Sequence, residues 1–355
     1  MSFRKRILDV LNGRKPDKIP FFSFEELIPC GFFERELRNM GMGFVLLSSP
    51  LQLFSSNVSF TTQSSAKGTR TTYHTPKGDI YFTFYNNTKR IASPGWEVKS
   101  DFFIKNNKDY EALIFMIQDT LFEADIEEFT ERDYELGEDG ISHVVGPMPP
   151  YTEAQLLIGL EKWCFEQYDN TGKFNELLHA LQKRTEKHIE CLSNLNCTCL
   201  QHLGDISDNI SPENYIEYEV PHYKKAFAAL RSGERKVGIH IHAKFLARHK
   251  DWLASVKPDY VESYTPPPYS DISLPELRKA LGEKVSILIN FPEVIFYQGY
   301  EKTKKYTREL LESDSSFNKA IGFSEMGLMG VNSKNRKIFE EGFAAVAQAV
   351  NDLNL

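Results

Sequence analysis

The fold is decided by three β-rich runs: 236-KVGIHIHA-243, 259-DYVESYT-265 and 285-VSILINF-291. A helical pattern, 274-LPELRKALG-282, precedes the last run. Strands that alternate with helices in this way predict βαβ units and a parallel sheet. The same cadence gives five further strand candidates: 18-KIPFFSF-24, 43-GFVLLSS-49, 142-SHVVGPM-148, 196-NCTCLQHL-203 and 319-KAIGFSE-325. Eight such strands predict an α/β fold, the (β/α)₈ TIM barrel.

Residues 54–105 break this cadence. In 71-TTYHTPKGDIYFTFYNN-87, Thr, Tyr and Phe alternate with polar residues around a Pro-Lys-Gly-Asp turn. The pattern is typical of an antiparallel β-hairpin, which we expect as an N-terminal insertion against the mouth of the barrel. The chain has no internal repeat or low-complexity linker, so residues 1–355 are predicted to form a single domain. A division into two domains near residue 130 is the alternative.

The composition excludes several classes of protein. A chain of 355 residues with 41% hydrophobic and 26% charged residues can bury a full core. The net charge of -7, without a basic stripe, argues against a nucleic-acid partner. No signal peptide and no membrane span are expected, because no apolar stretch has the required length and flanks.

The cysteines indicate a cytoplasmic protein. Five are scattered without a framework spacing, which is typical of reduced thiols. Cys197 and Cys199 form a C-x-C pair that we interpret as small residues of a buried strand; a contribution to a metal site is the alternative.

Several segments resemble the uroporphyrinogen decarboxylase superfamily. The opening 6-RILDVLNGRKPDKIPF-21 is similar to the family's entry helix and first strand. The order and spacing of four further segments extend the resemblance over nearly the whole chain: 75-TPKGDIYF-82, 237-VGIHIHA-243, 281-LGEKVSILINFPEVIF-296 and 322-GFSEMGLMGVNSKNRKIFEEGFAAVAQAV-350. The resemblance implies a TIM barrel.

One departure from the family points to its methyltransferase branch. The decarboxylases carry an arginine-rich loop after the first strand, which neutralises the carboxylates of the porphyrinogen. Here the loop reads 21-FFSFEELIPCGFF-33, and Glu25 and Glu26 would repel such a substrate. The resemblance then implies an enzyme that moves methyl groups between a small compound and a corrinoid protein.

The same resemblance implies a zinc site. Thiol-activating members bind zinc through a His-x-Cys strand and a later Cys, and these positions read His240-Ile241-His242 and Glu325 here. Histidines two apart on a strand point to the same side, and catalytic groups in barrels lie at the carboxyl ends of strands. Together with Glu262, these residues are our candidate metal ligands. The alternatives are structural histidines, a rim ion pair of Glu262 with Lys244 or Arg248, and a capping role for Glu325.

Three further residues are candidates for catalytic roles. Asn290 lies at a strand end, and Asp205 could orient a histidine or hold the substrate. Tyr264, with Tyr269, flanks the proline run 266–268 and could line an apolar pocket. The alternatives are a turn residue at Asp205 and a stiff surface turn around the prolines.

The sequence therefore predicts an enzyme, a corrinoid-protein-dependent methyltransferase of the O-demethylase type. Its expected substrate is a small methylated compound such as an aryl methyl ether, whose oxygen zinc would polarise. Nitrogen and oxygen ligands in place of thiolates suit oxygen chemistry. The cobalamin is expected on a separate corrinoid-binding protein, because the chain has no Asp-x-His-x-x-Gly motif. The alternatives are methyl transfer from methylcobamide to a thiol or another acceptor, and a non-catalytic barrel that binds a corrinoid or porphyrin. A homodimer is possible in each case.

Overall fold

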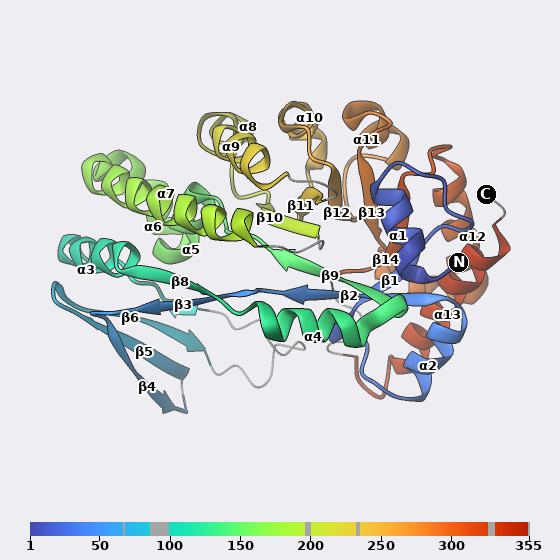
Figure 1. Ribbon diagram of the computed structural model, residues 1–355, viewed down its shortest axis with the longest axis horizontal. Helices are drawn as coiled ribbons and strands as arrows, with labels where there is room; N and C mark the ends of the chain where they lie inside the picture. The colour runs from blue at the N-terminus through green and yellow to red at the C-terminus, as the bar shows by residue number, and fades with distance from the viewer. Residues whose placement is uncertain (67, 86–98, 196–199, 232–234, 326–330, 354–355) are drawn as a thin grey trace.

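The computed structural model describes residues 1–66, 68–85, 99–195, 200–231, 235–325 and 331–353 (Figure 1). For residues 85, 99, 100, 200–203 and 205 only the backbone is described.

Eight parallel strands form the central sheet. They are β1 (Phe21–Phe24), β2 (Met42–Ser48), β9 (Gly140–Val145), β10 (Leu200–Ile206), β11 (Val237–Ile241), β12 (Tyr260–Tyr264), β13 (Ser286–Asn290) and β14 (Lys319–Phe323). Their order is β1-β14-β13-β12-β11-β10-β9-β2, and β2 also pairs with β1, so the hydrogen-bonded ring closes. Every residue of β11 to β14 is buried, as expected for parallel strands that are covered on both sides.

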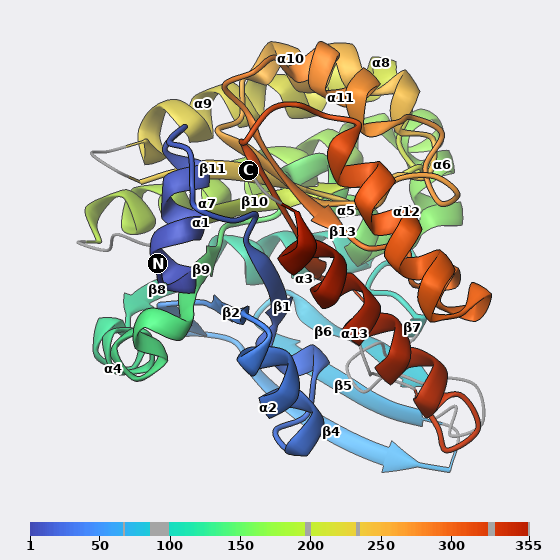
Figure 2. The ribbon, with the colours of Figure 1, turned by 90° about the vertical axis from the view of Figure 1, so that its right-hand side faces the viewer.

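Helices connect the parallel strands and pack outside them. They are α1 (Phe3–Leu11), α2 (Phe32–Asn39), α5 (Pro150–Ile158), α6 (Leu160–Asp169), α7 (Thr171–Asn194), α8 (Pro212–Asn214), α9 (Val220–Leu230), α10 (Lys250–Val256), α11 (Leu274–Leu281), α12 (Tyr300–Glu312) and α13 (Arg336–Asp352). Short 3₁₀ helices cover Glu25–Leu27, Gly137–Asp139, Leu246–Arg248 and Glu293–Gln298, and a π-helical turn covers Tyr215–Glu219. In Figure 2, α10 to α13 follow one another around the outside of the strands.

Local signals in the sequence fix the ends of these helices. In α11, Ser273 and Glu276 form a reciprocal capping box, Pro275 lies in the first turn, and Gly282 ends the helix with a φ of 86°. None of the helices in the described ranges combines the length and the apolar character that crossing a membrane requires.

The predicted (β/α)₈ TIM barrel with a single hairpin at residues 54–105 is wrong as a description of this fold. Six of the fourteen strands in the described residues lie outside the parallel sheet, all between β2 and β9. β3 (Leu51–Ser55) pairs with β8 (Thr120–Ala124), and a second antiparallel sheet has the order β4 (Ser59–Ser65), β5 (Gly68–Thr75), β6 (Gly78–Tyr85), β7 (Lys99–Asp101). The chain is a mixed α/β protein with one parallel and two antiparallel sheets.

The hairpin of the prediction is β5–β6, and its partner strands were missed for a physical reason. β4 reads SFTTQSS and all seven of its residues are exposed, so it has no alternation of apolar and polar residues. The part of the chain between β2 and β9 also contains two helices, α3 (Asn107–Gln118) and α4 (Ile126–Leu136). Figure 1 shows β4, β5 and β6 as a separate layer beyond β3 and β8. That residues 1–355 form one domain stays a prediction.

Candidate metal centre

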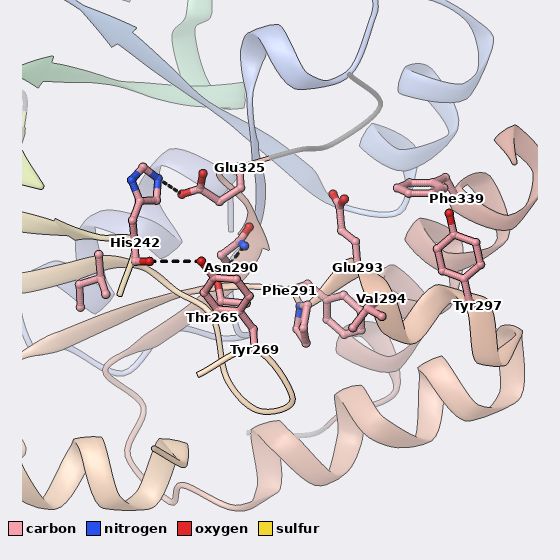
Figure 3. Close-up of a pocket in the computed structure, with 12 residues that line it drawn as sticks. His242, Thr265, Tyr269, Asn290, Phe291, Glu293, Val294, Tyr297, Glu325 and Phe339 are labelled. Carbon is pink, nitrogen blue, oxygen red and sulfur yellow. Dashed lines mark hydrogen bonds and ion pairs between the residues drawn. The ribbon is translucent and has the colours of Figure 1, made fainter. Parts of the chain in front are cut away.

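Three polar side chains converge at the carboxyl ends of two strands. His240 lies in β11, His242 follows its last residue, and Glu325 lies two residues beyond β14. The Nε2 atoms of His240 and His242 are 2.8 Å apart. Oε1 of Glu325 lies 3.0 Å from Nε2 of His240 and 2.8 Å from Nε2 of His242. Figure 3 shows the side chains of His242 and Glu325 facing each other.

The strand geometry explains why the two histidines meet. Residues two apart on a strand lie on one side, and the backbone N–H of His242 donates to the Ile206 carbonyl at 2.7 Å, which extends the pairing with β10. The two rings are 4.3 Å apart at 81°. Their Nε2 atoms therefore point at one place.

The charges within this cluster are strongly coupled. Burial lowers the pKa of His240, but hydrogen bonds to Glu262 and Glu325 outweigh it and raise the pKa to about 10. Burial raises the pKa of Glu325, but hydrogen bonds from His240 and His242 bring it down to about 2. Without an ion, a proton on His240 therefore offsets the charge of Glu325.

The donor set fits a divalent metal ion. The lone pairs of two imidazole nitrogens and a carboxylate oxygen within 3.0 Å of one another need a proton or a metal cation among them. The three atoms are close enough for one ion to contact them all at the usual Zn–N and Zn–O distances of about 2.0–2.2 Å. Two histidines and a glutamate are a common ligand set of catalytic zinc sites, which keep one position open.

Glu262, the fourth predicted ligand, lies elsewhere. Its Oε2 is 3.4 Å from Nδ1 of His240, on the opposite side of the ring from the converging Nε2. Its Oε1 is 3.2 Å from Nδ1 of His143, and both of these side chains are fully buried. Glu262 therefore does not join the three converging atoms, as predicted, but contacts one of the candidate ligands, His240. The rim ion pair of Glu262 with Lys244 or Arg248 is also wrong, because the carboxylate is inside the sheet.

A largely apolar cavity of about 640 Å³ opens beside the cluster. The residues that line it are Ile241, His242, Thr265, Tyr269, Asn290, Phe291, Pro292, Glu293, Val294, Tyr297, Glu325 and Phe339. Figure 3 shows His242 and Glu325 at one end of this set and Tyr297 and Phe339 at the other. The volume and lining suit a small, mainly apolar molecule.

The remaining predicted residues divide between cavity and core. Asn290 lines the cavity, and its side chain donates to Thr265 Oγ1 at 2.9 Å and accepts from the Ser324 N–H at 3.0 Å. Tyr264 does not line it, because its buried hydroxyl donates to the Ile272 carbonyl at 2.8 Å. Tyr269, by contrast, lines the cavity and donates to the His242 carbonyl at 3.2 Å.

The structure describes only the backbone of Asp205 and does not describe the C-x-C pair. Asp205 stands opposite His240 in the β10–β11 register, but its side chain lies outside the described residues. Cys197 and Cys199 also lie outside them.

The sequence reasoning missed His143 and Tyr260, which adjoin Glu262 inside the sheet. His143 carried a signal, because it is an ionisable residue between Ile141 and two valines, whereas Tyr260 carried none. It also missed Phe291, Tyr297 and Phe339, which carry no individual motif.

The chain matches no known protein family and no curated protein sequence. The resemblance to the uroporphyrinogen decarboxylase superfamily therefore stays a prediction from its motifs.

Proposed function

We propose that this protein is a metal-dependent methyltransferase that removes a methyl group from a small, mainly apolar methyl ether. The observation that carries the proposal is the meeting of Nε2 of His240, Nε2 of His242 and Oε1 of Glu325 at the end of an apolar cavity. A bound zinc ion would supply Lewis acidity toward the ether oxygen.

The residues of the chain would hold and orient the substrate. The rings of Phe291, Tyr297 and Phe339 offer an apolar surface for an aromatic body. Thr265 and Asn290 lie at the polar end, and their mutual hydrogen bond fixes both side chains. Such positioning of a reactive bond against a second reactant contributes much of the rate in a displacement.

The methyl acceptor is proposed to be the cobalt of a cobalamin on a separate corrinoid-binding protein. The methyl–oxygen bond breaks with its electron pair on the oxygen, and the electron pair of cobalt(I) forms the new bond to the methyl carbon. The oxygen then takes up a proton and leaves as a phenol or alcohol. This partner and a cytoplasmic location rest on the sequence alone.

Metal content tests the first half of the proposal. We expect about one zinc per chain in the wild type after purification without chelators, and little in His242→Ala or Glu325→Gln. His74→Ala is the matched control, because His74 also pairs with a carboxylate, Asp79, but lies in the antiparallel sheet. A metal-free wild type that also fails to bind added zinc would overturn the Lewis-acid proposal.

Methyl transfer tests the second half. Zinc-loaded protein with 2-methoxyphenol and free cob(I)alamin should convert the corrinoid to methylcobalamin, which is followed by its absorbance. Glu325→Gln removes a ligand and should reduce the rate by more than the about 10–100-fold that loss of a residue behind a ligand costs. Zinc binding without transfer from 2-methoxyphenol, methanol or an N-methylated amine would remove methyl transfer to corrinoid from the proposal.

A further inference from the structure

We infer that Tyr260, His143 and Glu262 form a buried positioning chain that holds His240 in the orientation and tautomer needed for metal binding. The inference rests on the metal site proposed above and assigns roles to three residues that lie outside it.

The chain is continuous and lies inside the closed sheet. The Tyr260 hydroxyl meets Nε2 of His143, Nδ1 of His143 lies 3.2 Å from Glu262, and Glu262 lies 3.4 Å from Nδ1 of His240. Tyr260, His143 and Glu262 have no exposed surface. They come from β9 and β12, whereas His240 comes from β11, so the contacts cross the interior of the sheet.

One assignment of protons suits every contact in this chain while His240 binds a metal through Nε2. In it, Glu262 is ionised: its Oε2 accepts from Nδ1–H of His240, and its Oε1 faces Nδ1–H of His143 at an ion-pair distance. His143 then carries a lone pair on Nε2, which accepts the Tyr260 hydroxyl. His240 likewise presents a lone pair on Nε2, directed at His242 and Glu325. A carboxylate behind a ligating histidine fixes its tautomer and ring orientation in this way.

The backbone is shaped to admit this chain. β12 contains one residue more than β13 between Val261 and Tyr264, and within this bulge Ser263 has a φ of 59°. A positive φ is costly for a residue other than glycine and often marks a functional site. The Ser263 hydroxyl lies 2.5 Å from the hydroxyl of Ser324, the neighbour of Glu325. The bulge thus ties the strand that carries Glu262 to the third member of the cluster.

Gly238, which stands opposite Tyr260 in the β11–β12 register, also indicates that the backbone makes room for this chain. A Cβ atom on Gly238, two residues before His240, would lie 2.3 Å from the ring of Tyr260. The absence of a side chain at this position lets the tyrosine ring pack against the backbone of β11 at Gly238. Glycine in a buried strand weakens it, so the arrangement is consistent with a demand for the ring at this place.

Zinc affinity, measured by competition with a chromophoric chelator, tests the chain. Glu262→Gln replaces one of the two oxygens, which face different histidines, by an NH2 group and should weaken zinc binding by about 10–100-fold. Tyr260→Phe removes only a hydroxyl and should weaken it by a smaller factor, about 3–10-fold, through the loss of one hydrogen bond. Tyr264→Phe is the matched control: it is an equally buried tyrosine of β12 that donates outside the chain, and its zinc affinity should equal that of the wild type.

Nuclear magnetic resonance of metal-free protein with ¹⁵N-labelled histidine rings separates the inference from the proposed function. We expect slowly exchanging Nδ1–H signals from His143 and His240, and the loss of their protection in Glu262→Gln. A wild type with these signals but without zinc binding would reject the metal site and leave the chain in place. Absence of the signals, or unchanged zinc affinity in both Glu262→Gln and Tyr260→Phe, would overturn the inference.

Discussion

At the scale of single residues, His240 is the point on which the site depends. One ring nitrogen faces Glu262, and the other faces His242 and Glu325. The sequence could predict that His240, His242 and Glu325 approach one another, because strand periodicity and parallel strand ends place them together. It could not predict which side of the ring Glu262 meets, because this depends on the twist of β12 and on its bulge.

The stability of the metal-free protein should depend on the protonation of His240. Its folded pKa of about 10 exceeds the usual 6.5, so its stabilising contribution is complete below pH 6.5 and is lost as pH rises through 10. In excess chelator, we expect the Tm to fall between pH 7 and 10, and His240→Asn to remove part of this fall. Circular dichroism at a series of pH values measures it. Equal slopes in both proteins would contradict the prediction.

Glu219 should produce a second pH dependence, remote from the site. It is fully buried, and burial raises its pKa to about 7, although Thr152 donates to Oε1 from its backbone N–H at 2.9 Å and its hydroxyl at 2.8 Å. Because the folded pKa lies above the usual 4.5, the free energy of unfolding should fall as pH rises from 4.5 to 7. Glu219→Gln keeps the acceptor oxygen and cannot ionise.

The Glu219→Gln variant should therefore show no such fall between pH 5 and 8. At pH 8 we expect it to be more stable than the wild type by about 3 kcal/mol, since each unit of pKa corresponds to about 1.4 kcal/mol. Urea denaturation at both pH values measures the difference. A variant that is less stable by the same amount at pH 5 and pH 8 would show that Glu219 does not titrate in this range.

At the scale of strands and helices, apolar content decided what could be predicted. Strands β1, β11, β13 and β14 are fully buried and were visible as apolar runs, whereas β4 consists of exposed Ser, Thr and Gln residues with one phenylalanine. The extra residue in β12 left no signal either, because 259-DYVESYT-265 reads as an ordinary strand. The sequence could predict the strands that are buried, but not the features that depend on which strands pair.

Gly238→Ala tests whether β11 and β12 require their close approach. The new methyl group would meet the ring of Tyr260, and overpacking of this kind costs about 1–3 kcal/mol. We expect the variant to be destabilised by that amount in urea denaturation and to bind zinc more weakly, because Tyr260 must move. Gly172→Ala is the control: nothing lies within 4 Å of its added Cβ in α7, so its stability should stay the same or rise by up to about 1 kcal/mol. Similar losses in both variants would contradict the packing argument.

At the scale of the whole molecule, the four-stranded antiparallel sheet is joined to the rest through aromatic packing. Phe103 is buried, and its ring lies 5.7 Å from that of Tyr73 in β5 and 5.3 Å from that of Phe82 in β6. Its backbone N–H donates to the Leu157 carbonyl of α5 at 3.1 Å. Phe103 therefore connects this sheet to a helix that packs outside the parallel strands.

Phe103→Ala should loosen the antiparallel sheet and leave the parallel strands intact. Truncation of a buried phenylalanine costs about 3–5 kcal/mol, and here the loss falls on contacts with Tyr73 and Phe82. In native-state hydrogen exchange we expect faster exchange in β5 and β6 with unchanged protection in β11 and β13, because within the described residues the aromatic contacts of Phe103 are with Tyr73 and Phe82. Phe60→Ala is the matched control, since Phe60 packs on the same Tyr73 at 5.8 Å but is 66% exposed and should change exchange little. Equal loss of protection in β11 and β5 would mean that the two sheets unfold as one cooperative unit.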